Sequence, residues 1–178
     1  MPRSNIHRIQ DSVYGLMEFR DMETVVIEIL RTPELQRLRR IHQMGLAYFV
    51  FPGAEHSRWI HSLGASYLAI RFGKRLGEST REFLTDFFRP KESVIRDFAV
   101  ASLCHDLGHG PLSHTWEREI LGKSFNFKKW TESLGVSDEK DFLKGAKWHE
   151  IVTYSLLKWE EGHLNKLLEQ HESGFSFI

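Results

Sequence analysis

The sequence predicts an all-α fold, with a mostly helical single domain over residues 1–178 and at most a minor β-hairpin near residues 47–52. Apolar side chains recur at three- and four-residue spacing in several stretches, which is the pattern of amphipathic helices. Glycine, proline or strongly polar segments separate these stretches, as expected of connections. With 178 residues, of which 41% are apolar and 27% charged, the composition is that of one soluble globular domain.

The first distinct helix is predicted for residues 32–45. Thr32 is a favourable N-cap, Pro33 suits the first helical position, and Gly45 suits the left-handed residue that ends a helix. The arginines of its opposite, solvent-facing side are Arg37, Arg39 and Arg40.

Two weaker signals flank this helix. An upstream helix is expected around residues 18–31, because apolar residues are concentrated in its second half. Residues 47–51 favour an extended conformation that stops at Pro52 and Gly53, which is where a little β structure is expected.

A long helix is predicted for residues 61–77, with one apolar stripe that is expected to be buried. The residues of this stripe are His61, Ala65, Leu68, Phe72 and Leu76. The histidine that opens the stripe is therefore expected at the edge of the core.

Another helix is predicted for residues 94–105, and glycines at 108 and 110 impose a turn directly after it. The residues aligned along this helix are Val94, Phe98, Ala101 and His105. Residues 122–147 are expected to form an irregular insertion or connection, and residues 148–159 return to helical spacing.

Charge and cysteine content exclude several classes of protein. The formal net charge is zero, which removes the usual argument for a general polyanion binder, so nucleic-acid binding is unsupported. The single cysteine, Cys104, excludes a disulfide framework and is expected to pack in the core; it fits a reducing compartment, so we expect a cytoplasmic protein. The longest apolar run, residues 46–51, is too short for a membrane helix, and the polar N-terminal segment lacks the features of a signal peptide.

Histidines and one aspartate stand where the 94–105 helix ends. His61, His105 and Asp106 would together offer two imidazoles and a carboxylate, a set suited to a divalent first-row metal. Neighbouring helical residues point about 100° apart, so His105 and Asp106 can share an ion only where the helix is ending. From spacing alone, each of these residues could equally be a hydrogen-bonded core or capping residue.

Four segments in a fixed order change this balance: PELQRLRRIHQMG (33–45), VFPGAEHSRWIHSLG (50–64), HDLGHGPLSH (105–114) and WHE (148–150). Together they resemble the HD-domain phosphohydrolases, specifically the branch of deoxynucleoside triphosphate triphosphohydrolases. The resemblance covers about residues 6–160. It implies a helical HD-domain bundle, a bound divalent metal (Mn, Fe, Ni, Zn or Mg), a dNTP pocket beside the metal, and a homo-oligomer.

The resemblance also implies roles for individual residues. The implied metal ligands are His61, His105 and Asp106. The implied phosphate-facing side chains are Arg58, His109, His114 and His149, and Gln43 would contact the sugar 3′-hydroxyl. The acid for the leaving oxygen would be His114 with Glu117, or His149 with Glu150.

The sequence departs from the family pattern in two places. The family has a further, distant aspartate ligand, but no aspartate follows Asp141 here. The resemblance therefore implies a C-terminally incomplete domain, the N-terminal part of a longer enzyme, or a derivative that has lost activity. Arg31 stands where guanine-regulated members carry an aspartate, so a guanine-specific activator is not expected.

Three functions remain open at this point. The leading hypothesis is a metal-dependent hydrolysis of a dNTP to a deoxynucleoside and triphosphate. A phosphodiesterase or phosphomonoesterase acting on another nucleotide would use the same metal set. A catalytically impaired nucleotide-binding or oligomerisation module is the third hypothesis, and it is favoured by the missing aspartate.

Overall fold

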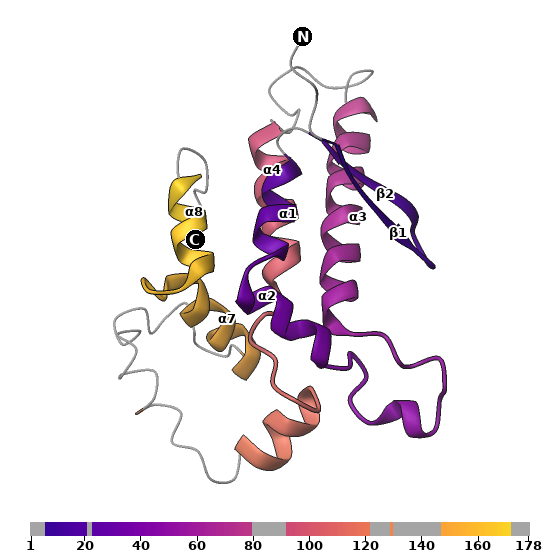
Figure 1. Ribbon diagram of the computed structural model, residues 1–178, viewed down its shortest axis with the longest axis vertical. Coiled ribbons are helices and arrows are strands. Elements are labelled where there is room, and N and C mark those ends of the chain that lie inside the picture. Colours follow the sequence, from indigo (N-terminus) through magenta and orange to yellow (C-terminus); the bar gives the residue numbers. More distant parts are fainter. Residues whose placement is uncertain (1–5, 21–22, 80–91, 122–128, 130–146, 172–178) are drawn as a thin grey trace.

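The computed structural model describes residues 6–20, 23–79, 92–121, 129 and 147–171. It is mostly helical, as the sequence predicts, and its only sheet within these residues is a two-stranded hairpin (Figure 1). The strands and α-helices are β1 (Ile6–Asp11), β2 (Gly15–Arg20), α1 (Thr24–Leu30), α2 (Pro33–Gln36), α3 (Arg58–Ser79), α4 (Glu92–Cys104), α7 (Trp148–Lys158) and α8 (His163–Gln170). The shorter elements are two 3₁₀ helices, Arg37–Arg40 and Ala47–Phe49, and a π-helical turn, Trp116–Leu121.

The hairpin lies near the N-terminus, not at residues 47–52 where it was expected. The Oδ1 atom of Asp11 accepts the amides of Val13 and Tyr14 at 2.8 and 2.9 Å, and Gly15 takes the left-handed φ of +71° that closes the turn. Along β2, Met17 and Phe19 are buried; the strand contacts α1, and the ring of Phe19 lies against Tyr67 of α3. The prediction for residues 47–52 was wrong because aromatic residues favour strands only where a partner strand is present, and none lies there among the described residues.

The predicted helix over residues 32–45 is shorter than expected. Thr32 is the N-cap, and its Oγ1 accepts a hydrogen bond from the amide of Leu35 at 3.5 Å. The α-helix then tightens into the 3₁₀ helix, and the chain is extended by Ile41. Gly45 has a left-handed φ of +58° in a later turn, where an added Cβ would lie 3.1 Å from the carbonyl oxygen of Leu112. The helix expected over residues 18–31 is likewise divided between β2 and α1.

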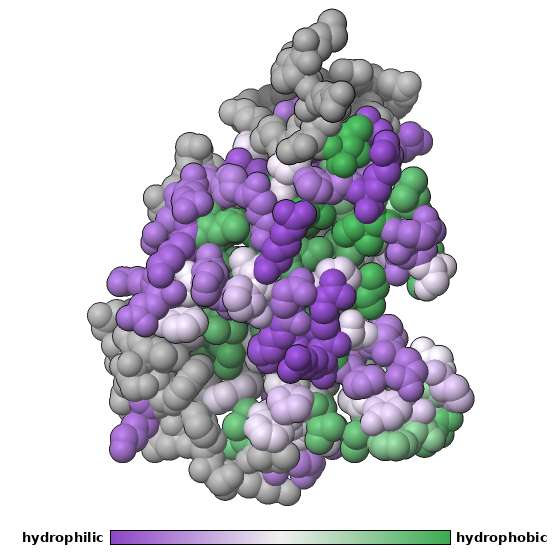
Figure 2. All heavy atoms as spheres, in the orientation of Figure 1, coloured by the Kyte–Doolittle hydropathy of each residue, from purple (hydrophilic) through white to green (hydrophobic). Residues whose placement is uncertain are grey.

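Helices α3 and α4 pack side by side and occur where they were predicted, but their buried faces are different. On α3 the core side chains include Leu63 and Ile70, whereas Phe72, from the stripe expected to be buried, is 62% exposed. On α4 the core side chains include Ala99 and Val100. The stripe residues that stay exposed are Leu68, Phe72, Leu76, Val94 and Phe98. Figure 2 shows one face of the molecule, on which hydrophobic side chains lie among hydrophilic ones.

Helix α8 joins this core through α1 and α2, and α7 packs on α8. The carboxylate of Glu34 in α2 caps the start of α8, since its Oε1 accepts the amide of His163 at 2.9 Å. The insertion expected at residues 122–147 lies outside the described residues, apart from residues 129 and 147. Within the part of the chain that is described, no helix combines the length and apolar character needed to cross a bilayer.

Cys104 provides a test of the core. Its side chain is buried, and burial raises the pKa of the thiol to about 12. Because the thiolate is the reactive form, about one molecule in ten thousand would carry it at pH 8. We expect a disulfide reagent such as DTNB to label the native protein very slowly and to titrate one thiol after denaturation. Fast labelling of the native protein would contradict this packing.

Candidate functional site

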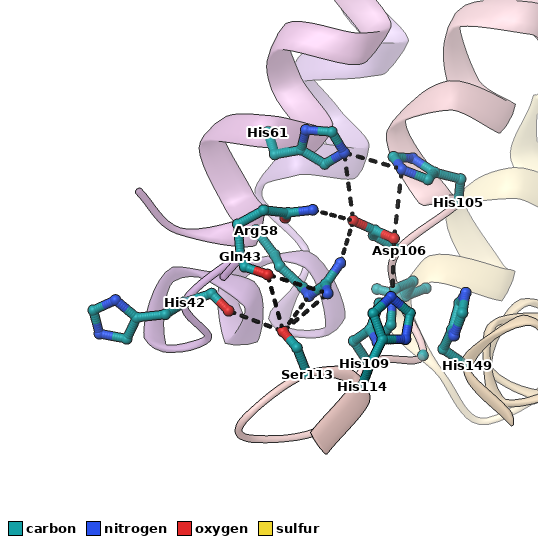
Figure 3. A network of polar contacts seen from close by, with 12 residues as sticks. His42, Gln43, Arg58, His61, His105, Asp106, His109, Ser113, His114 and His149 are labelled. Carbon is teal, nitrogen blue, oxygen red and sulfur yellow. Dashed lines mark hydrogen bonds and ion pairs between the residues drawn. The ribbon is translucent and has the colours of Figure 1, made fainter. Parts of the chain in front are cut away.

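Three potential metal ligands converge where the beginning of α3 meets the end of α4 (Figure 3). The Nε2 atoms of His61 and His105 lie 3.2 Å apart, and each lies 3.5 Å from an oxygen of the Asp106 carboxylate. Ligand atoms about 2.1 Å from a common ion, at angles of roughly 90–110°, are separated by about 3.0–3.4 Å. The two nitrogens and the carboxylate therefore fit one divalent cation.

The rings of both histidines are prepared to act as neutral ligands. The Nδ1 atom of His105 lies 2.7 Å from the carbonyl oxygen of Ser102, so Nδ1 carries the proton and the lone pair of Nε2 faces the cluster. Burial lowers the pKa of His61, outweighing the attraction of the Asp106 carboxylate, and favours the uncharged ring that a metal requires.

Asp106 is the buried carboxylate of the cluster. Arg58, itself 1% exposed, donates to Oδ2 of Asp106 at 2.5 Å, and Nε2 of His109 lies 3.3 Å from Oδ1. Burial on its own would raise the pKa of Asp106, but the hydrogen bond to His109 and the positive charge of Arg58 outweigh it and lower this pKa far below its ordinary value. The carboxylate is therefore ionised.

A second polar cluster surrounds the carboxylate of Glu117, a residue of the π-helical turn. Its Oε1 lies 2.7 Å from Nδ1 of His109 and 3.2 Å from Nδ1 of His149, and its Oε2 lies 3.3 Å from Nδ1 of His114. Burial raises the pKa of Glu117, but the hydrogen bond to His149 and the nearby histidines lower it overall. One carboxylate thus lies within 3.3 Å of a ring nitrogen of three histidines, and its contacts with His114 and His149 have hydrogen-bond geometry.

The second cluster is less suited to a metal than the first, although its ligand atoms all lie within 4.8 Å of one another. The rings of His109 and His149 stack with centroids 3.8 Å apart and planes inclined by 17°. Because ring-nitrogen lone pairs lie in the ring plane, two stacked rings direct them in parallel and not toward one point. The arrangement is better suited to sharing protons with Glu117.

Helix α7 brings His149 to this cluster by packing directly on the turn after Asp106. A Cβ on Gly108 would lie 2.0 Å from the carbonyl oxygen of His149 and 2.6 Å from the amide nitrogen of Thr153. The Gly108 amide also donates to Oγ1 of Thr153 at 2.8 Å. Glycine is required at this position because the backbone of α7 occupies the space of a side chain.

Ser113 holds Arg58 in place, a role that the sequence analysis missed. Its buried hydroxyl accepts from Nε and Nη2 of Arg58 at 3.1 and 2.9 Å and lies 3.0 Å from the carbonyl oxygen of His42. Leu112 and Ser113 have φ values of 63° and 54°, a left-handed backbone that is uncommon in residues other than glycine. Such unusual backbone geometry is the one local signal of a functional turn, and it is not visible in a sequence.

The remaining predicted residues lie in different surroundings. Gln43 donates to Asp106 Oδ2 at 3.4 Å, and its own Oε1 is buried without a partner. Arg58 faces Asp106, while Glu150 accepts the amide of Lys147 at 2.6 Å and caps its own helix. The expected pairing of His149 with Glu150 is therefore replaced by a pairing with Glu117, because adjacent residues of a helix point in different directions.

Comparison with known proteins assigns the family. The HD domain profile matches residues 58–172, which include both clusters. The chain belongs to the HD-domain family. It is 41% identical over 153 residues to "Deoxynucleoside triphosphate triphosphohydrolase SAMHD1" of Mus musculus, and the match covers 85% of this chain and 22% of that protein.

Two further relatives span a wide range of organisms. The SAMHD1 homolog of Dictyostelium discoideum is 35% identical over 151 residues, covering 85% of this chain and 24% of that protein. The uncharacterized protein YwfO of Bacillus subtilis (strain 168) is 40% identical over 113 residues, covering 61% of this chain and 23% of that protein. This HD-domain chain therefore spans less than a quarter of the length of these curated relatives.

The packing of α7 on Gly108 can be tested by substitution. In Gly108→Ala the added methyl group would force the two backbones apart, so we expect a loss of about 1–3 kcal/mol or more in the free energy of unfolding, measured by denaturant titration. Gly53→Ala is the control, because a Cβ there has no neighbour within 4 Å and its φ is not left-handed. It should change stability by less than about 0.5 kcal/mol. Equal stability of the two variants would contradict the close approach.

Proposed function

We propose that this HD domain is the catalytic core of a metal-dependent phosphohydrolase that acts on nucleotides, most specifically on deoxynucleoside triphosphates. In that reaction water attacks the α-phosphorus, the bond from that phosphorus to the 5′-oxygen breaks, and the deoxynucleoside leaves with a proton on that oxygen while triphosphate is released. The observation that carries this proposal is the meeting of three metal-type ligands with a histidine–carboxylate cluster through one shared residue, His109.

His61, His105 and Asp106 would hold the metal. A divalent ion bound there would polarise a phosphoryl oxygen and increase the acidity of water. The chain contributes two neutral imidazoles and one ionised carboxylate, so the site would retain a net positive charge with the ion bound, as an anionic substrate requires. The tautomer set by the carbonyl of Ser102 keeps the ligand nitrogen of His105 free of a proton.

The cluster around Glu117 would supply the proton for the leaving oxygen. His114 is the member whose side chain is most open to solvent, at 64% exposed, whereas those of His109 and His149 are 1% and 9% exposed. An exposed imidazole can reach a substrate, and a largely buried carboxylate behind it holds the ring in place. We therefore assign His114 as the proton donor and Glu117 as the group that orients it, with His109 and His149 fixing the carboxylate.

Gln43 and Arg58 would act on the substrate side of Asp106. The unpartnered Oε1 of Gln43 is a buried acceptor beside the cluster, which supports a contact with a sugar hydroxyl. Arg58 is fully engaged with Asp106 and Ser113, so its main contribution would be to hold the Asp106 carboxylate. A phosphate contact from Arg58, as the family resemblance implies, would need one of these hydrogen bonds to be exchanged.

The printed names of the relatives support dNTPs as the substrate class over other nucleotides. Product analysis distinguishes the alternatives: triphosphate release supports the proposal, whereas inorganic phosphate or a nucleoside monophosphate as product would identify a phosphomonoesterase or phosphodiesterase. Binding of dNTPs without any product would favour a nucleotide-binding module.

The metal assignment makes a prediction that is independent of turnover. We expect Asp106→Ala and His105→Ala to lower the metal content of purified protein, measured by plasma mass spectrometry after incubation with Mn²⁺ and desalting, because each removes a ligand. His163→Ala is a matched control, since His163 is an exposed histidine on α8 whose backbone bond to Glu34 survives the change. Unchanged stoichiometry in both site variants would refute this metal site.

The proton-transfer assignment predicts a different pattern. Glu117→Gln removes the negative charge but keeps the shape, so metal content should be retained while triphosphate release from a labelled dNTP falls by about 10²–10⁴-fold, the usual loss when a general acid fails. His163→Ala should release triphosphate at the rate of the unmodified chain. If Glu117→Gln also lost its metal, the division of labour between the two clusters would be wrong.

A further inference from the structure

Arg37 reaches from the short 3₁₀ helix to the turn that carries Asp106 and His109. Its Nη1 donates to the carbonyl oxygen of His109 at 2.8 Å, and its Nη2 donates to the carbonyl oxygen of Leu107. The two acceptors are 70 and 72 residues away in the sequence. One guanidinium therefore binds two carbonyls of the same turn, one on each side of Gly108.

Within the described part of the chain, the guanidinium of Arg37 binds these two carbonyls and forms no ion pair. Among the described residues, no carboxylate lies within ion-pair distance of Arg37. The turn follows the C-terminal end of α4, where main-chain carbonyls lack helical partners and a cation is favourable. A planar guanidinium presents two parallel N–H donors to two such carbonyls, which a lysine ammonium cannot do in the same way.

The opposite side of the turn is held by α7. The Gly108 amide donates to Thr153, so the N–H side of the turn is bound by α7 while the carbonyl side is bound by Arg37. The other main-chain hydrogen bonds of this segment are local, such as that from the His109 amide to the Asp106 carbonyl oxygen at 3.2 Å. Besides the side-chain bonds of Asp106 with Arg58 and Gln43, these two long-range contacts of the main chain determine where the turn lies.

We propose that Arg37 is a positioning residue: by binding the carbonyls of Leu107 and His109, it holds Asp106 toward the metal ligands and His109 toward Glu117. This inference rests on the proposed function for its catalytic meaning. The two hydrogen bonds from Arg37 to the carbonyls of Leu107 and His109, which we call the clamp, do not depend on it. Removing such outer contacts to metal ligands commonly lowers metal affinity or activity by about 10–100-fold.

The test compares Arg37→Met, Arg37→Lys and the matched control Arg40→Met. Arg40 lies three residues further on the same 3₁₀ helix, is exposed, and has no polar contact among the described residues. Hydrogen exchange measured by mass spectrometry should be faster in Arg37→Met over the peptide of residues 105–114 and unchanged over residues 60–70. Arg37→Lys keeps the charge but can bind only one of the two carbonyls, so hydrogen exchange over this peptide should be intermediate. Arg40→Met should show the same exchange as the unmodified chain.

The second measurement is the Mn²⁺ dissociation constant, obtained from electron paramagnetic resonance titration. We expect it to rise about 10–100-fold in Arg37→Met. Leu168→Ala, a core change in α8, is the control for general loss of stability, and at matched thermal stability it should leave the Mn²⁺ affinity unaltered.

Each outcome decides between the clamp, the positioning role and the proposed function. Unchanged exchange over residues 105–114 in Arg37→Met overturns the clamp. Faster exchange with unaltered Mn²⁺ affinity, or an equal loss of affinity in Leu168→Ala, overturns the positioning role. Faster exchange in a chain that binds no Mn²⁺ in any form supports the clamp and contradicts the proposed function.

Discussion

The buried charge of Asp106 is the constraint on which the site depends. A carboxylate removed from water costs several kcal/mol unless it is paired and hydrogen-bonded. Here Arg58 donates to it, and His61, His105 and His109 face it from α3 and from the turn after α4. Meeting this one electrostatic requirement brings separate segments together and leaves ligand-type nitrogens directed at the same small volume.

The turn after Asp106 is adapted to that requirement. Gly108 lets the backbone of α7 approach closely, and Ser113 adopts a left-handed conformation that costs an ordinary residue about 1–3 kcal/mol. The hydrogen bonds of Ser113 with Arg58 and of Arg37 with the turn offset this cost. Strain and anchoring therefore occur at the same few residues that carry the candidate chemistry, as is usual where a site must be rigid.

Much of the candidate site could be predicted from the sequence because four short segments in a fixed order resemble the HD-domain phosphohydrolases. The His–Asp doublet and the glycines after it left the ligand role open, and the resemblance assigned it; His105 and Asp106 do converge with His61. Contacts between distant segments were not predictable. Arg37 is exposed, as expected, but its hydrogen bond to Leu107 was missed, and His149 was paired with Glu150, because neither this contact nor the docking of α7 leaves a pattern in the sequence.

The sequence by itself determined that helices lie near residues 61–77 and 94–105, observed as α3 and α4, because the spacing of apolar side chains reports the period of a helix. Only the tertiary structure decided which face is buried. Both helices carry apolar residues on more than one side, and α3 buries Leu63 and Ile70 while Phe72 remains exposed. A period is a property of one segment, whereas the buried face depends on where α1, the hairpin and the partner helix lie, and that information resides in contacts between residues far apart in the chain.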